Sequence, residues 1–278
     1  MSNERLLLDS YLKTLKLPTM RAEYKALARK CSQANAAYED FLQQLAELEV
    51  QHRTAAAIER RLRQAGFPMV KEMSSYKFAD VPKLNKKYVL DLVRCQYIET
   101  KTNLVLTGPP GVGKTHLAIA FGREACRRGH KVKFFTASQL VNTYIEARQE
   151  RMILKLEKNI QRCDLIIVDE LGYIPLDRIG AEHLFGFFSQ CYEQTSLAVT
   201  TNLPFADWPQ VFAEDERLAG ALLDRSTATP RLQADFTHTI GQIPDFSQMQ
   251  AEVHGPDALE MAIQAARYNP GRVYVCDD

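Results

Sequence analysis

The stretch Asn103-Leu-Val-Leu-Thr-Gly108-Pro-Pro-Gly-Val-Gly-Lys114-Thr115 decides the fold of this 278-residue chain. Its second part matches the pattern GxxxxGK[ST], follows an apolar run and opens a segment of helical period. Glycines here let backbone amides turn toward phosphate oxygens, and the helix N-terminus adds partial positive charge. Lys114 is predicted to reach the β- and γ-phosphates of a nucleotide, and Thr115 to bind Mg²⁺. The expected phosphate-binding residues are Gly108, Pro109, Pro110, Gly111, Val112, Gly113, Lys114 and Thr115.

An acidic pair ends a second apolar run, Leu165-Ile-Ile-Val-Asp169-Glu170. Ligands of parallel sheets bind at the carboxyl ends of the strands, so both carboxylates are expected beside the phosphates. Asp169 is predicted to hold Mg²⁺ with Thr115, and Glu170 to orient or deprotonate the attacking water. The simpler alternative is a buried strand that ends in two solvated carboxylates. The paired acids, and the extra strand between them and the loop, favour nucleotide hydrolysis over small-molecule kinase or GTPase chemistry.

Two further polar features follow along the chain. The run Leu197-Ala-Val-Thr-Thr201 ends at Asn202, whose amide is predicted to bind the attacking water or the γ-phosphate. A plain strand-end cap is the alternative. Arg225 follows an apolar helical stretch and is a candidate for completing the site of a neighbouring subunit, with Arg217 as its competitor. Spacing alone does not choose between these arginines, and it leaves an ordinary surface role open.

Apolar runs alternate with helical segments from residue 102 onward, which is typical of a parallel sheet covered by helices on both faces. The fold class is therefore α/β, a P-loop NTPase sheet flanked by helices and preceded by a small all-helical domain. The predicted strands are 103–107, 131–136, 164–169, 196–201 and a fifth near 236–240, and the predicted helices include 86–96, 115–128 and 181–193. The predicted divisions are a helical domain (1–67), a connector (68–101), the ATPase core (102–225) and a tail (226–278).

The helical front carries a cluster of arginines. Leu8, Leu12 and Leu15 recur at helical spacing, as do later leucines of the same region. Four arginines then fall within eleven residues, and Arg and Lys supply sequence-independent affinity for phosphates. A solvated helix face is the alternative. The residues predicted to contact nucleic acid are Arg53, Arg60, Arg61 and Arg63.

Composition is that of an ordinary globular protein, with 46% hydrophobic and 25% charged residues. No uncharged apolar run reaches the roughly 18 residues needed to cross a bilayer, so no membrane partner is expected. Six cysteines without a CxxC pair, and an N-terminus unlike a secretory signal, favour reduced thiols in the cytosol. The net charge of +1 is a cancellation: residues 1–101 carry 18 Lys and Arg against 12 Asp and Glu, whereas residues 226–278 carry 3 against 7.

Three strings together resemble the IstB family, the helper ATPases of bacterial insertion sequences, which are related to DnaC-type helicase loaders. The strings are Gly108-Pro-Pro-Gly-Val-Gly-Lys-Thr-His-Leu-Ala118, Val168-Asp-Glu-Leu-Gly-Tyr173 and Thr200-Thr-Asn-Leu-Pro-Phe205, the last followed by Trp208. The resemblance runs to about Arg225, roughly four-fifths of the chain. His116 belongs to the first string and so joins the expected nucleotide-binding residues, although a packing role in the first helical turn is the alternative.

The resemblance implies an AAA+ core that binds ATP and Mg²⁺ in the bacterial cytoplasm. It further implies a homo-oligomer that assembles on duplex DNA and works with the element's transposase in choosing target DNA. By position it makes Lys114, Asp169, Glu170, Asn202 and Arg225 the catalytic set, with Arg225 acting in trans. The chain departs from the family pattern after Arg225, where Ser226-Thr-Ala-Thr-Pro-Arg231 replaces the usual continuation.

Two other functions share the same motifs. A helicase loader would have the same ATPase core and a replicative helicase as its partner. A non-catalytic, nucleotide-dependent DNA scaffold would need ATP binding without turnover.

Overall fold

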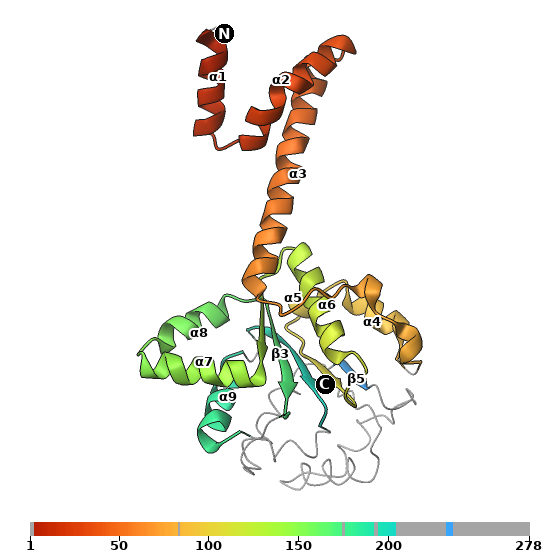
Figure 1. The fold of residues 1–278 in the computed structure, drawn as a ribbon, viewed down its shortest axis with the longest axis vertical. Helices are drawn as coiled ribbons and strands as arrows, with labels where there is room; N and C mark the ends of the chain where they lie inside the picture. The colour runs from red at the N-terminus through yellow and green to blue at the C-terminus, as the bar shows by residue number, and fades with distance from the viewer. Residues whose placement is uncertain (1–2, 83, 174–175, 192–193, 204–231, 236–278) are drawn as a thin grey trace. The chain divides into compact units, whose positions relative to one another are not determined.

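The computed structural model describes residues 3–82, 84–173, 176–191, 194–203 and 232–235 (Figure 1). Contacts divide the chain into a first unit, residues 1–60, and a second unit, residues 61–278. Arg217, Arg225, and the predicted tail apart from 232–235 lie outside the described residues. No helix among the described residues is long and apolar enough to cross a membrane.

The first unit is helical, as the leucine spacing predicts. It contains α1 (Asn3–Thr14), α2 (Pro18–Gln33) and most of α3 (Tyr38–Ala65). Pro18 occupies the start of α2, where its fixed φ suits the helix and its missing N–H costs nothing. The buried carboxylate of Glu49 on α3 accepts the amides of Thr19 and Met20, each at 2.9 Å, so it caps α2 and joins the two helices.

The second unit is built on a five-stranded parallel sheet with the order β2-β3-β4-β1-β5 (Figure 1). The phosphate-binding loop follows β1, which lies between β4 and β5, and the acidic pair lies on the neighbouring inner strand β3. The strands are β1 (Leu104–Thr107), β2 (Val132–Thr136), β3 (Leu165–Leu171), β4 (Ser196–Thr201) and β5 (Leu232–Asp235).

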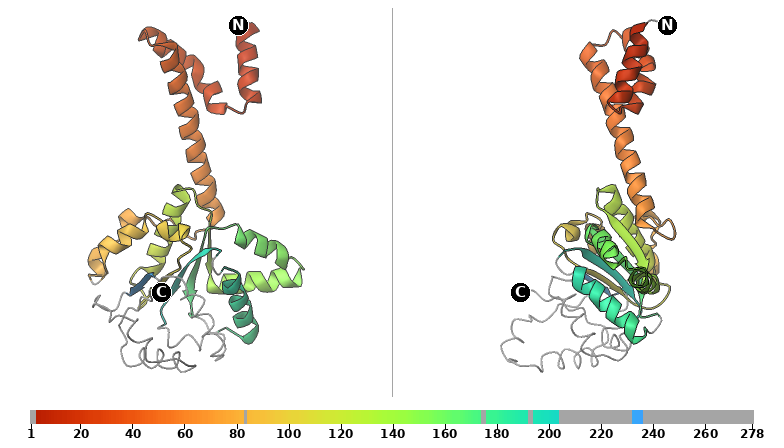
Figure 2. Two further views of the ribbon diagram at one scale, coloured as in Figure 1. Left: turned by 180° about the vertical axis from the view of Figure 1, so that it is seen from behind. Right: turned by 90° about the vertical axis from the view of Figure 1, so that its left-hand side faces the viewer.

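Helices cover both faces of this sheet (Figure 2). On one face, Leu104 and Leu106 of β1 pack with α6 (Lys114–Arg127). On the other face, Val105 joins the cluster formed with α7 (Ala137–Gln149), α8 (Ile153–Gln161) and α9 (Arg178–Cys191). Burial on both faces explains why the strands read as continuous apolar runs rather than alternating ones. The α/β fold predicted from the sequence is confirmed.

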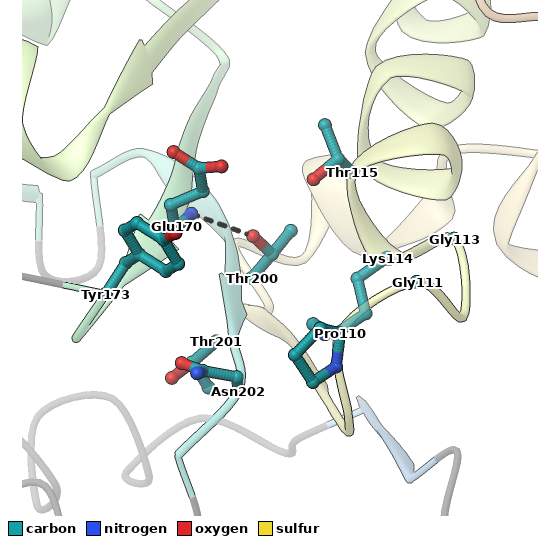
Figure 3. Close-up of a pocket in the computed structure, with 10 residues that line it drawn as sticks. All are labelled: Pro110, Gly111, Gly113, Lys114, Thr115, Glu170, Tyr173, Thr200, Thr201 and Asn202. Carbon is teal, nitrogen blue, oxygen red and sulfur yellow. Dashed lines mark hydrogen bonds between the residues drawn. The ribbon is translucent and has the colours of Figure 1, made fainter.

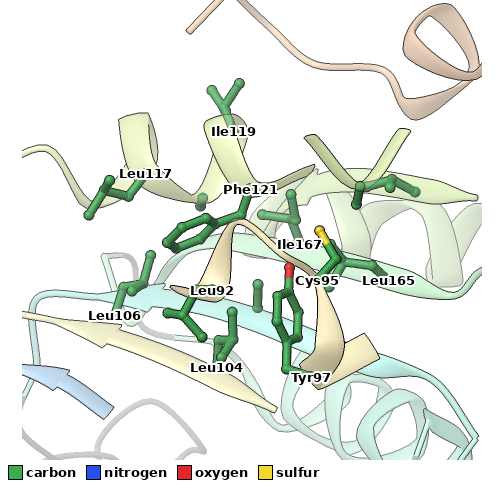
Figure 4. Close-up of a cluster of buried hydrophobic side chains, with 14 of the residues drawn as sticks. Leu92, Cys95, Tyr97, Leu104, Leu106, Leu117, Ile119, Phe121, Leu165 and Ile167 are labelled. Carbon is green, nitrogen blue, oxygen red and sulfur yellow. The ribbon is translucent and has the colours of Figure 1, made fainter. Parts of the chain in front are cut away.

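The segment expected as a connector packs into the core on the α6 face. It forms η1 (Met73–Ser75), η2 (Phe78–Asp80), α4 (Lys86–Leu92) and α5 (Gln96–Glu99). The single helix predicted over 86–96 is wrong in its last turn, because Cys95 has a left-handed φ of 63° and divides α4 from α5. Leu92, Cys95 and Tyr97 are buried among the side chains of β1, β3 and α6 (Figure 4).

A fifth strand is present, and its described residues lie directly before the predicted position. The described strand is β5, which pairs with β1 from Leu104 opposite Leu232 to Thr107 opposite Asp235. The predicted position, 236–240, lies outside the described residues. The sheet therefore includes residues that follow Arg225.

Candidate active site

A cavity of about 300 Å³ opens at the carboxyl ends of β1, β3 and β4 (Figure 3). It brings together the glycine-rich loop, the end of β3 with its acidic pair, and the end of β4, which are three separate motifs in the sequence. The lining residues are Pro110, Gly111, Gly113, Lys114, Thr115, Glu170, Tyr173, Thr200, Thr201 and Asn202.

The loop after β1 has the backbone that phosphate binding requires. Gly111 and Gly113 have φ of +84° and +90°, in the left-handed region that favours glycine, and Gly113 is the residue before α6. The Lys114 ammonium donates hydrogen bonds to the carbonyl oxygens of Gly108 at 2.7 Å and Pro109 at 2.9 Å. The pKa of Lys114 is lowered, because partial burial of the ammonium has a larger effect than the nearby Asp169 carboxylate, which raises it. The ammonium thus lies against its own loop, at the point where the phosphates of a nucleotide would replace the two carbonyls as partners.

Thr115 and Asp169 meet across the gap between α6 and β3. The Thr115 hydroxyl donates to Asp169 Oδ1 at 2.9 Å, and the Asp169 side chain is buried. A hydroxyl and a carboxylate at hydrogen-bond distance are oxygen ligands of the kind that Mg²⁺ prefers, with nucleotide phosphates and water as its other ligands. This donor set fits the predicted Mg²⁺ site.

Thr200 belongs to the site although the sequence assigned no role to it. Its hydroxyl donates to Asp169 Oδ1 and accepts the backbone N–H of Glu170 at 3.0 Å, so one side chain holds both members of the acidic pair. Glu170 has a left-handed φ of 60°, and the pairing of β3 with β4 shifts register between Val168 and Leu171. The exposed Glu170 is one of the residues that line the cavity (Figure 3). The sequence feature that points to this role is the string Thr200-Thr201-Asn202, in which a hydroxyl side chain precedes Asn202 by two residues.

Replacing Thr200 with valine removes this hydroxyl and keeps the volume of a buried side chain. Each unsatisfied buried partner costs about 1–3 kcal/mol, so we expect ATP turnover to fall about tenfold or more while ATP binding persists. Thr201→Val is the matched control, because the Thr201 hydroxyl donates to Leu171 O, accepts the Leu203 N–H and, among the described residues, makes no hydrogen bond to Asp169 or Glu170. Steady-state turnover and ATP titration check this, and equal turnover in both variants would contradict the role of Thr200.

His116 lies in the first turn of α6, but its side chain is not among those that line the cavity. Its Nε2 lies 2.9 Å from the Glu72 carbonyl oxygen, and its ring stacks edge-on with Tyr76 at 5.3 Å between centroids. The structure therefore places the imidazole against residues 72–76, in the packing position that the sequence left as the alternative.

Glu72 and Tyr76 connect the segment after α3 to α6 and to the phosphate-binding loop. Burial opposes ionisation of Glu72, but hydrogen bonds from Arg127 and Arg123 on α6 prevail and lower its pKa. The Tyr76 hydroxyl donates to Val112 O at 3.2 Å, and a Cβ on Gly113 would lie 2.8 Å from the Tyr76 ring. The segment after α3 is thereby fastened to the loop and to its helix.

Tyr76→Phe tests whether the hydrogen bond from Tyr76 to Val112 positions the loop. The variant keeps the ring against Gly113 and loses only the bond to Val112 O, which is worth about 1 kcal/mol. We expect roughly a fivefold rise in KM for ATP with little change in kcat. Tyr88→Phe on α4, another half-buried tyrosine, is the control, and indistinguishable KM values for the two variants would contradict the positioning role.

The predicted arginines are placed unevenly. Arg53 donates to Glu49 at 2.8 Å and to the carbonyl oxygen of Lys16, so part of its capacity is used within the first unit. Arg60 is exposed in the first unit, and Arg61 and Arg63 belong to the second unit. Arg225 and Arg217 lie outside the described residues, so neither is placed at the cavity.

Comparison with known proteins gives a consistent result. A family model described as IstB-like ATP binding protein matches residues 10–231. An IS21 insertion-sequence protein of Pseudomonas aeruginosa, named for ATP binding, is 35% identical over 218 residues, covering 78% of this chain and 82% of the relative. The corresponding IS5376 protein of Geobacillus stearothermophilus is 34% identical, covering 78% and 86%. AMPPCP-bound DnaA from Aquifex aeolicus has a TM-score of 0.51 at 14% identity, covering 73% of this chain and 66% of DnaA, which supports the fold alone.

Proposed function

The chain belongs to the family of IstB-like ATP-binding proteins, and from this we propose that it is an ATPase that assembles on DNA. In this proposal the protein hydrolyses ATP with Mg²⁺, forms a homo-oligomer on duplex DNA and helps the transposase of the same element to select its target. The observation that carries the hydrolytic part is the convergence of Lys114, Thr115 and Glu170 at one cavity, with the buried Asp169 hydrogen-bonded to Thr115.

The residues of the cavity divide the work of hydrolysis. Mg²⁺, when bound, neutralises charge on the β- and γ-phosphates. Lys114 exchanges its two carbonyl partners for phosphate oxygens, and Thr115 and Asp169 provide ligands for the metal. Glu170 orients the attacking water and accepts its proton. Asn202 lies on the same cavity wall and contributes a hydrogen bond to that water or to the γ-phosphate.

The homo-oligomer is proposed from the family resemblance, and in it a neighbouring subunit would supply a further cation at the γ-phosphate. Arginines supplied by a neighbouring subunit stabilise the charge of the transition state in many NTPases. We propose Arg225 for this role, with Arg217 as the competing residue. Their alanine variants should separate the two, because the trans-acting arginine is needed for turnover in the oligomer and not for binding ATP to one subunit.

The DNA-binding part of the proposal rests on the family and on charge. Arg53, Arg60, Arg61 and Arg63 would contact backbone phosphates and give affinity without reading sequence. The setting would be the bacterial cytoplasm, where the element and its target DNA are found.

The partner is tested by capture of a target duplex. Full-length protein is mixed with the transposase of the same element and a labelled duplex, with and without ATP and Mg²⁺, and the transposase is pulled down. We expect ATP-dependent recovery of both the protein and the duplex. If the full-length protein does not associate with the transposase and instead captures a replicative helicase from a bacterial extract, the helicase-loader alternative is supported.

A further inference from the structure

A basic surface lies on the second unit at the end of the sheet where β2 begins, opposite the nucleotide cavity. Five cations from three segments form it, and we call it the basal surface. Its members are Arg61 near the end of α3, Arg127 and Arg128 at the end of α6, and Lys131 and Lys133 around the start of β2.

Two contacts join these segments into one surface. The Lys133 ammonium donates to the carbonyl oxygen of Gln64 at 2.8 Å, which ties β2 to the end of α3. The Arg61 guanidinium lies 4.0 Å from the position that a Cβ on Gly129 would occupy, so it lies over the turn between α6 and β2. The cations are therefore neighbours because of the fold, although they are about 70 residues apart in sequence.

The local carboxylates neutralise only part of this charge. Glu72 and Glu124 are shared among Arg123, Arg127 and Arg128. Within the described part of the chain, Arg61, Lys131 and Lys133 form no ion pair with a carboxylate. Asp164 accepts a hydrogen bond from the backbone amide of Lys131 at 2.8 Å. Among the residues that the structure describes, these three cations therefore have no carboxylate as an ion-pair partner.

We propose that the basal surface binds the phosphate backbone of duplex DNA, which extends the DNA contact from the α3 arginines onto the ATPase core. The proposal rests on the proposed function, because it assigns more of the DNA surface to the same protein. All five residues are Lys or Arg, which suit phosphate contacts that carry no sequence information. The proposal commits to duplex DNA because the proposed function already places the protein on a duplex.

Lys131→Glu is the sharpest test, because the Lys131 side chain is exposed and makes no hydrogen bond within the described protein. Its matched control is Lys155→Glu on α8, an exposed lysine with the same change of charge away from the basal surface. Binding of full-length protein to a labelled duplex of arbitrary sequence is measured with ATP over a series of salt concentrations. Titration with ATP is the control that checks whether both variants still bind the nucleotide.

We expect Lys131→Glu to raise the Kd for duplex about fivefold at low salt and to reduce the salt slope by about one unit. Lys131→Gln should fall between wild type and Lys131→Glu, and Lys155→Glu should match wild type. If wild type binds duplex and the variants at 131 and 155 behave alike, the basal surface is not a DNA surface and the proposed function stands. If wild type binds no duplex with ATP, the proposed function itself fails. Preferential binding of a single strand would also overturn the assignment.

Discussion

Lys114→Ala is expected to abolish ATP binding and, with it, assembly on DNA. The ammonium is the one side-chain cation among the residues that line the described cavity, and its two present partners are carbonyls of the loop itself. Its loss removes the charge that the β- and γ-phosphates require, so we expect the Kd for ATP to rise about a hundredfold or more. Isothermal titration with ATP and Mg²⁺ measures this directly.

The folded state should tolerate this change. The hydrogen bonds of Lys114 to Gly108 and Pro109 are at the surface of an open cavity, so thermal unfolding without nucleotide should shift little. Lys87→Ala on α4 is a suitable control, because it removes an exposed lysine elsewhere on the second unit. ATP-dependent complexes on duplex DNA that persist in Lys114→Ala would refute the role assigned to this residue.

Glu170→Gln is expected to bind ATP normally and to stop at the hydrolytic step. The amide keeps the size of the side chain and the left-handed backbone but cannot accept the proton of the attacking water. A positioned general base contributes about 10²- to 10⁴-fold, so turnover should fall by that factor. The backbone N–H of Glu170 still donates to Thr200, which preserves the arrangement of Asp169.

This variant also separates an ATPase from a scaffold. If hydrolysis controls disassembly, Glu170→Gln should form ATP-dependent DNA complexes that last longer than those of wild type, and transposition should stall. Asp169→Asn provides the contrast, because it removes the carboxylate of the Mg²⁺ site and should weaken Mg²⁺-dependent ATP binding. A Glu170→Gln protein that supports transposition at the wild-type rate would favour the non-catalytic scaffold.

Local patterns in the sequence predicted the frame of the site well. Strand β4 lies where predicted, at 196–201, and α6 begins one residue before its predicted start. These elements could be read because burial on both faces of a parallel sheet produces apolar runs, and the loop glycines mark the turn between them. The meeting of Lys114, Glu170 and Asn202 followed from the rule that parallel strands end at one edge.

Contacts between distant residues could not be predicted in the same way. Thr200 forms hydrogen bonds with Asp169 and Glu170 at the point where the pairing of β3 with β4 shifts register. The sequence of one strand alone does not predict such a shift. Tyr76 contacts Val112 across 36 residues that include α4, α5 and β1, and the pattern of none of these elements predicts that contact. The basal surface likewise depends on Lys133 meeting the end of α3. Each of these features depends on tertiary packing, which the sequence specifies only through the whole fold.

The most direct test of ATP-driven assembly on DNA is sedimentation velocity of the full-length protein with a short labelled duplex. It is run with ATP and Mg²⁺ and again without nucleotide. The proposed function predicts large, DNA-containing oligomers that require ATP and Mg²⁺, are absent in Lys114→Ala and persist in Glu170→Gln. Sedimentation of protein and duplex that is the same with and without ATP would contradict the claim that ATP binding drives assembly on DNA.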